Sequence, residues 1–102
     1  MNPLQMREML ANAQKMQEDL KNKLEETIVE ASSGGGMVTA RMNGKKQLLA
    51  LRIDASVVDP RDVEILQDLV SAAINEAGRK ADDAMQSGIS GMLGGLNIPG
   101  LV

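Results

Sequence analysis

The sequence predicts an α+β fold in which two long helices flank a three-stranded antiparallel sheet. Two stretches with apolar residues at spacings of three and four indicate one helix on each side of the sheet in chain order. Between them, residues 37–54 form the only segment with strict two-residue alternation, which indicates a β-hairpin. A shorter β-branched stretch precedes the hairpin. The expected order is therefore α-β-β-β-α, and a chain of 102 residues is short enough for one domain.

The first helix is predicted over residues 3–24. Asn2-Pro3 provides a capping residue followed by proline at the first helical position. One narrow apolar stripe follows, formed by Met6, Met9, Ala13, Met16, Leu20 and Leu24. Opposite charges four residues apart, such as Lys21 and Glu25, favour a solvent-exposed polar face over a phosphate-binding ridge.

The predicted first strand covers residues 25–33, where Thr27, Ile28 and Val29 are β-branched. The three glycines at 34–36 then predict a turn. A phosphate-binding loop would need a Lys-Ser/Thr ending and a following helix, whereas here a strand follows. The glycines are therefore interpreted as a hairpin connection.

In the central hairpin, Asn43-Gly44 suits a two-residue type I′ turn. Such a turn would place Arg41 opposite Lys46 and Val38 opposite Leu49. One side of the hairpin would then be a core face, made by Val38, Ala40, Met42, Leu49, Leu51 and Ile53. The other would mix basic and apolar side chains, namely Met37, Thr39, Arg41, Lys46, Leu48, Ala50 and Arg52.

The second helix is predicted to begin with Asp59 as cap, followed by proline, and to end near Gln86. Its apolar arc covers about half of the circumference, wider than one sheet contact requires. Either the first helix or a second subunit must cover the excess, and its alanines favour a homodimer. The residues expected at that interface are Ile65, Leu69, Ala72 and Leu48. Residues 1–86 are predicted to form the domain, and residues 87–102 a flexible glycine-rich tail.

The composition excludes several classes of function. The chain has no Cys and no His, so the usual thiolate and imidazole chemistry and the commonest metal ligand are absent. No Ser or Thr has a recognisable base, and no acidic residues have metal-ligand spacing. We therefore expect no enzyme activity, no cofactor, no metal and no small-molecule substrate. With no signal peptide and no run of 18 apolar residues, a cytoplasmic protein without membrane contact is predicted.

The charge distribution makes the hairpin a basic island in an acidic chain. The net charge is −3, yet residues 37–54 hold four basic residues and one acid. A polyanionic partner would compensate this clustering. The alternative is that Glu30 or other acids of the strands neutralise the face and that Lys45 and Lys46 only solubilise the turn. The residues alone favour neither interpretation.

The order helix, strand, Gly34-Gly35-Gly36, strand, Asn43-Gly44, strand resembles the YbaB/EbfC family of bacterial nucleoid-associated proteins. The resemblance covers the whole chain and is carried further by Ile53-Asp54, Asp59 to Glu64, Leu66 to Val70, Ala73 to Lys80 and Pro99-Gly100-Leu101. It implies a tweezer-like homodimer that binds double-stranded DNA and compacts or marks the nucleoid.

The residues limit how such a protein would bind DNA. Without Phe, Tyr or Trp there is no ring to stack on bases, and no helix presents a row of Arg, Asn or Gln. Largely sequence-tolerant phosphate contacts are therefore predicted. The main candidates are Arg41, Lys45, Lys46 and Arg52, and the secondary ones are Lys21, Lys23, Arg79 and Lys80. The competing hypothesis is a protein-interaction module whose Met-rich and Ala-rich surfaces hold another protein, with weak or incidental DNA binding.

Overall fold

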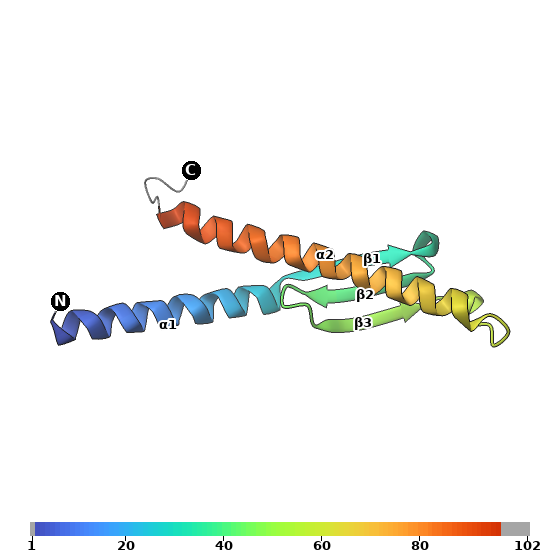
Figure 1. Cartoon of the computed structure of the whole chain (residues 1–102), viewed down its shortest axis with the longest axis horizontal. Helices are drawn as coiled ribbons and strands as arrows, with labels where there is room; N and C mark the ends of the chain where they lie inside the picture. Colours follow the sequence, from blue (N-terminus) through green and yellow to red (C-terminus); the bar gives the residue numbers. More distant parts are fainter. Residues whose placement is uncertain (1, 97–102) are drawn as a thin grey trace.

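The computed structural model describes residues 2–96 and has the predicted α-β-β-β-α order (Figure 1). The elements are α1 (Pro3–Glu26), β1 (Ile28–Ser33), β2 (Val38–Asn43), β3 (Leu48–Ile53) and α2 (Val63–Leu96). Short 3-10 turns at Gly34–Gly36 and Ala55–Val57 connect β1 to β2 and β3 to α2. All three strands are antiparallel, in the order β1-β2-β3.

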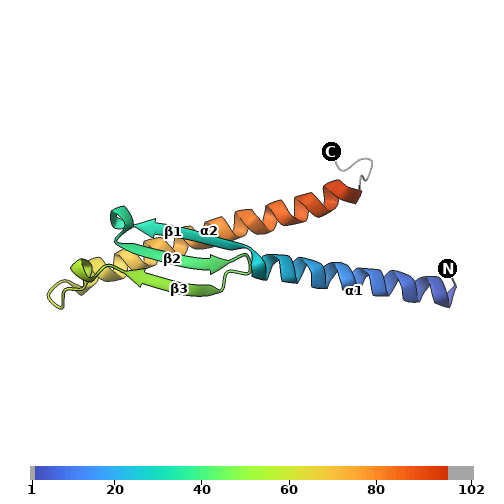
Figure 2. The same ribbon diagram turned by 180° about the vertical axis from the view of Figure 1, so that it is seen from behind.

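The molecule has a two-layer body from which two helical arms project. The first half of α2 crosses one face of the sheet and packs against β1 and β2, and the opposite face carries no helix (Figures 1 and 2). The rest of α2 and nearly all of α1 extend beyond the same end of the sheet and diverge. The single buried side chain of α1 is Leu24, in its last turn. The body therefore holds the core, and the arms are largely exposed.

The core is thin because small residues build it. Alanines of α2 at four-residue spacing pack on β2 and on one alanine of β1; the buried cluster is Ala31, Val38, Ala40, Met42, Ala73, Ala77 and Ala81. Val38 is the largest side chain that is completely buried. Side chains of this size let the helix axis come close to the sheet, and they remove little apolar area from water.

The two long helices begin differently. The capping prediction for α1 is confirmed: Asn2 Oδ1 accepts the Gln5 N–H at 2.7 Å, and the Gln5 side chain accepts the Asn2 N–H in return. The prediction of Asp59 as the cap of α2 is wrong. Asp59 to Asp62 form a turn, and α2 begins at Val63 with Asp62 Oδ1 accepting the Ile65 N–H at 3.5 Å.

The predicted end of the second helix at Gln86 is also wrong, because α2 continues to Leu96. Gly88 and Gly91 each lower helix propensity by about 1 kcal/mol relative to alanine. The apolar spacing nevertheless continues through Met85 and Ile89, four residues apart on one side of the helix. Residues 97–102 of the predicted tail lie outside the described residues, and the tail's flexibility and the domain limit at residue 86 remain predictions.

The predicted hairpin register is wrong as well. β2 ends at Asn43 and β3 begins at Leu48, so four residues form the loop instead of two. Val38 lies opposite Ile53 and Arg41 opposite Ala50, and a β-bulge then shifts the pairing. The bulge leaves the sequence Asn43-Gly44 at the start of a longer turn, whose positive φ of 65° falls on Lys46 instead of Gly44.

A tertiary contact explains why the Asn-Gly prediction failed. The Gly44 N–H donates to the carbonyls of Leu24 at 2.8 Å and Thr27 at 3.0 Å, at the end of α1. A Cβ on Gly44 would lie 2.9 Å from the Leu24 carbonyl oxygen, which is too close for any side chain. Glycine at this position therefore permits a close approach of two backbones, and this approach sets the loop conformation.

Candidate nucleic-acid interface

The loop at residues 44–47, termed the hairpin loop below, is held in one conformation by the buried side chain of Asn43. Asn43 Oδ1 accepts the backbone N–H groups of Lys45 and Gln47, both at 3.0 Å. Asn43 Nδ2 donates to Gln47 Oε1 at 2.6 Å. Because every polar group of this side chain is engaged, Lys45 and Lys46 extend from a rigid base.

The two lysines of the hairpin loop reach in different directions, one to each helix. Lys45 Nζ lies 3.3 Å from Glu25 Oε1 on α1, and Lys46 Nζ lies 3.3 Å from Asp82 Oδ2 on α2. The ion pair expected between Lys21 and Glu25 is absent among residues 2–91, because Glu25 forms its ion pair with Lys45. The hairpin loop thus bridges both arms at the point where they diverge.

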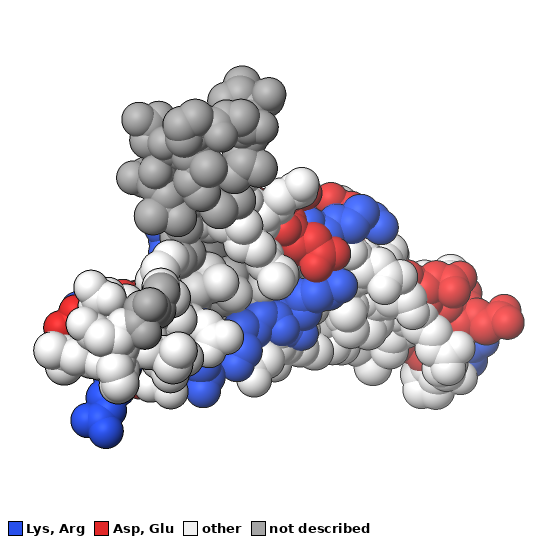
Figure 3. Space-filling view, turned by 60° about the vertical axis from the view of Figure 1, so that its left-hand side comes forward, with Lys and Arg blue, Asp and Glu red and all other residues white. Residues whose placement is uncertain are grey.

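The stem of Lys46 lies over Gly78 on the surface of α2. A Cβ at this position would lie 3.4 Å from Lys46 Cε, which is close to ordinary van der Waals contact. A shallow hollow of about 340 Å³ surrounds the stem, lined by Met42, Lys46, Ile74, Asn75, Gly78, Arg79 and Asp82. Figure 3 looks toward the arms and shows a band of Lys and Arg across the centre of this side, with acidic side chains directly beside it.

The predicted single basic face does not exist, because the structure separates its members. Arg41 and Arg52 lie on the sheet face that points away from α2, whereas Lys46 lies against α2. Arg41 sits on β2 between Glu30 of β1 and Ala50 of β3. Four-residue displacement of the register moved Lys46 from its expected place opposite Arg41 into the loop.

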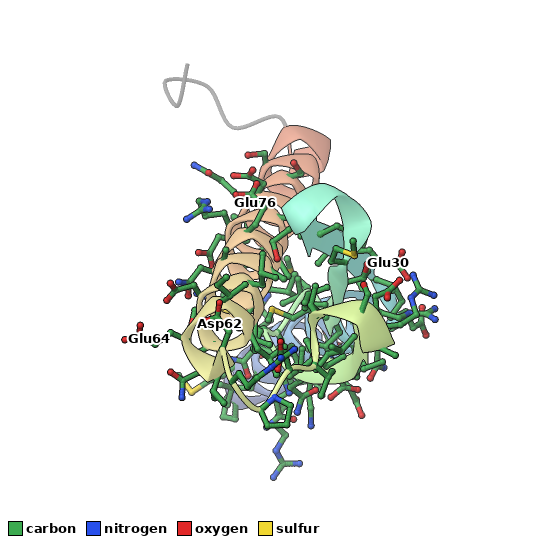
Figure 4. The ribbon with its side chains drawn as sticks, turned by 90° about the vertical axis from the view of Figure 1, so that its right-hand side faces the viewer. Glu30, Asp62, Glu64 and Glu76 are labelled. Atoms are coloured by element: carbon green, nitrogen blue, oxygen red, sulfur yellow. The ribbon has the colours of Figure 1, made fainter. Side chains whose placement is uncertain are left out.

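A second hollow, of about 190 Å³, lies beside Arg41 and Arg52 on the sheet face that points away from α2, termed the outer face below. Its lining residues are Glu30, Thr39, Arg41, Ala50, Leu51 and Arg52. Figure 4 shows Glu30 on the opposite side of the molecule from Asp62 and Glu64, which lie at the start of α2. Glu30 reduces the positive charge around Arg41, as the alternative interpretation expected, although no ion pair joins the two among the described residues.

The secondary candidates differ in how free their cations are. Lys21 is exposed and lies one helical turn before Glu25, on the side of α1 that faces Lys45, and Lys23 lies about 200° around the helix from Lys21. Arg79 forms an ion pair with Glu76, one turn earlier in α2. Lys80 Nζ donates to the backbone carbonyl of Glu30 at 2.7 Å. Arg79 lines the same hollow as Lys46, so it is the secondary candidate that the structure brings to the hairpin loop.

The four residues expected at a subunit interface are not neighbours within one protomer. Leu69 packs over Gly34 on the β1 side of α2, and Ile65 and Ala72 share that flank of the helix. Leu48 lies on β3, beyond the opposite flank. Ile65 is 53% exposed and Leu48 is 45% exposed, so both are free to contact another molecule.

The structure also exposes apolar surfaces that the sequence did not reveal. All of β3 is exposed, including Leu51 and Ile53, which share a sheet face with the buried Ala40 and Val38. They are uncovered because α2 packs on β1 and β2 and leaves β3 aside. On α1, the apolar stripe is covered only at its end, where Leu24 is buried; Met6, Met9 and Met16 of the stripe are exposed, and so are Leu4 and Leu10 beside it. The order of the strands and the direction of the helices decide that β3 and the stripe of α1 are exposed. The spacing of apolar residues does not encode either of them.

The segment before α2 carries the carboxyl groups with shifted pKa values. Hydrogen bonds from the side chain and backbone of Ser56 lower the pKa of Asp54, and those from Arg61 lower the pKa of Asp59. Within residues 2–96, no three acidic side chains gather as metal ligands would, and no helix combines the length and apolar character needed to cross a membrane.

Comparison with known proteins identifies the family. A family model described as the YbaB/EbfC DNA-binding family matches residues 1–96. The chain belongs to this family. YbaB/EbfC membership confirms the resemblance inferred from the sequence, and it agrees with the prediction of a non-enzymatic protein because the family is defined by DNA binding.

Relatives within the family align over nearly the full chain. A nucleoid-associated protein of Acidobacterium capsulatum is 54% identical, over 97% of this chain and 96% of that protein. One from Koribacter versatilis is 52% identical, over 98% and 99%. The crystal structure of an uncharacterized protein from Helicobacter pylori aligns with a TM-score of 0.76 at 30% identity, covering 91% of this chain and 98% of that one. The two proteins share one fold, and this match confirms the predicted α+β class.

Proposed function

We propose that this protein is a nucleoid-associated protein of the bacterial cytoplasm that binds double-stranded DNA as a homodimer. The names of the relatives and the DNA-binding family support the general function. The observation that carries the binding mode is the rigid hairpin loop with Lys45 and Lys46 between the two arms. Binding is largely independent of base sequence and acts through phosphate contacts.

Phosphate binding suits the side chains available at the hairpin loop. Lys45 and Lys46 offer ammonium groups from a fixed backbone, so little conformational freedom is lost on contact, and Lys21 of α1 offers another. No aromatic residue exists in the chain to stack on bases. Release of counterions from DNA therefore supplies most of the affinity, and the affinity falls steeply as salt rises.

The outer face provides a second, smaller set of contacts. Arg41 and Arg52 line one hollow there and have no ion pair among the described residues. Lys23, Arg79 and Lys80 add contacts at the margins, and the last two must first leave Glu76 and the Glu30 carbonyl. A homodimer doubles both sets, which matters because a few charges bind weakly alone.

The homodimer explains the uncovered apolar surfaces. The protomer buries only eight hydrophobic side chains among residues 2–91, a small core for a domain of this length. We place the exposed side of β3, with Leu48, against the flank of the partner's α2 that carries Ile65, Leu69 and Ala72. A twofold axis repeats that contact, so residues far apart in one protomer meet across the two copies.

Two double variants test the DNA-binding surface: Lys45→Glu with Lys46→Glu, and Arg41→Glu with Arg52→Glu. Affinity for duplex DNA is measured by fluorescence anisotropy over a series of salt concentrations. We expect the loop variant to lose more affinity, equally on unrelated sequences, with the salt slope reduced by about one per lost phosphate contact. Loss confined to the arginine variant would move the site to the outer face.

Light scattering tests the homodimer. The expected mass is twice the 10.9 kDa of the chain, and Leu48→Lys should shift it to the monomer, because an unpaired charge would be buried at the interface. Lys45→Glu serves as the control, since it should leave the mass unchanged. A dimer without DNA binding, even at low salt, would instead support the protein-interaction module.

A further inference from the structure

We infer that Glu25 and Asp82 are intramolecular competitors of DNA phosphate, which occupy Lys45 and Lys46 and thereby limit the affinity of the hairpin loop for DNA. This inference rests on the proposed function and names the residues that regulate it. It gives a role in DNA binding to two acidic side chains, one on each long helix.

The geometry places one carboxylate on each lysine of the hairpin loop. Lys45 Nζ and Glu25 Oε1 are 3.3 Å apart, as are Lys46 Nζ and Asp82 Oδ2. The two acids come from different helices, α1 and α2, and converge on a loop of only four residues. A lysine that contacts a phosphate from this position must first release its carboxylate or share itself between two anions.

The exposure of these pairs makes the exchange possible without unfolding. The side chains of Lys45 and Glu25 are 33% and 42% exposed, and those of Lys46 and Asp82 are 53% and 56% exposed. Exposed ion pairs contribute little to stability, so the strong field of a DNA backbone can displace the carboxylates. The displaced carboxylate then remains near the DNA and repels it, which adds to the cost of binding.

The chain contains its own matched control. Glu26 and Asp83 directly follow Glu25 and Asp82 on the same helices, and both are exposed without an ion pair among the described residues. Neighbouring helix positions point about 100° apart, so the control carboxylates lie close by but do not face the lysines. Any general effect of removing negative charge should therefore be similar for the two pairs.

The test compares Glu25→Gln with Asp82→Asn against Glu26→Gln with Asp83→Asn. Both double variants raise the net charge by two. Duplex affinity is measured by anisotropy at several salt concentrations, with helix content and mass checked for each variant. The variant that frees the lysines should bind about three- to tenfold tighter than its control, because one exposed ion pair accounts for up to about fivefold in an equilibrium constant.

A lysine background shows whether the gain depends on the proposed pairs. With Lys45→Gln and Lys46→Gln already present, the two acidic double variants should bind DNA equally. Equal affinities in the wild-type background, or a gain that survives without the lysines, would overturn the competition. If the wild-type protein itself fails to bind DNA at low salt, the proposed function fails instead, so the two failures are distinguishable.

Discussion

The two long helices have similar apolar periodicity and opposite surroundings. On α2, Ala73, Ala77 and Ala81 are completely buried against the sheet. On α1, Met6 and Met9 are more than half exposed, because only the last turn of this helix lies against the body of the protein. Periodicity therefore identifies which side of a helix is apolar, whereas chain direction and residue size decide whether anything covers it.

The starts of the two helices differ in the same way. A neutral residue, Asn2, caps α1 through a reciprocal bond with Gln5. Carboxylates organise the entry to α2, where Asp54 accepts hydrogen bonds from Ser56 and Asp59 from Arg61. The first arrangement is independent of pH and the second depends on ionisation. Four experiments, three with paired substitutions and one with acid titration, test both contrasts.

The largest difference is expected between two methionines. Met42→Ala should reduce the free energy of unfolding by about 2–5 kcal/mol, because Met42 is buried under α2 and its removal leaves a cavity. Met9→Ala on the exposed stripe of α1 should change it by less than about 0.5 kcal/mol. Urea denaturation at one fixed protein concentration measures both values. A large loss in Met9→Ala would mean that a partner covers α1.

Overpacking should separate the same two helices by a smaller amount. Ala77→Leu should cost about 1–3 kcal/mol, since the added carbons must fit between α2 and the sheet. Ala13→Leu makes the same chemical change at an exposed position of α1 and should be neutral within about 0.5 kcal/mol. Thermal denaturation compares the two variants. Similar melting temperatures would show that α2 lies less closely on the sheet than the structure indicates.

Removing the cap of α1 should have a moderate and local effect. Asn2→Ala should destabilise the first turns by about 1 kcal/mol, because the Gln5 N–H loses its acceptor. Hydrogen exchange should show faster exchange in the first turns of α1 and no change in β2. Asn12→Ala, within the same helix, is the control and should not accelerate exchange. Unchanged protection in Asn2→Ala would contradict the capping box.

The smallest effect is expected on acidification. Hydrogen bonds lower the folded-state pKa of Asp54 and Asp59 below the ordinary value of 3.8, so their contribution is complete above that value. It is lost as the pH falls through the lowered pKa. NMR should then show the segment before α2 loosening in acid while the capped start of α1 is unchanged. Asp54→Asn should remove the Asp54 part of that response, and an identical titration in the variant would refute its cause.

Much of the fold was predictable because its signals are local. Asn2-Pro3 specifies the start of α1, and β-branched or alternating residues specify three strands in the observed order. The basic residues of the hairpin were also predicted as candidates. The prediction that Lys46 shares one face with Arg41 and Arg52 was wrong, because a longer loop and a bulge at Arg41/Met42 placed Lys46 beside α2 and left Arg41 on the outer face.

By itself, the sequence determined the α-β-β-β-α order, the cap of α1 and the basic character of the hairpin. Tertiary structure alone decided the hairpin register, the exposure of β3 and the pairing of Lys45 and Lys46 with Glu25 and Asp82. The physical reason is visible at Gly44. Its neighbours favour a tight turn, but its N–H bonds to the end of α1, so a contact twenty residues away in sequence outweighs the local preference.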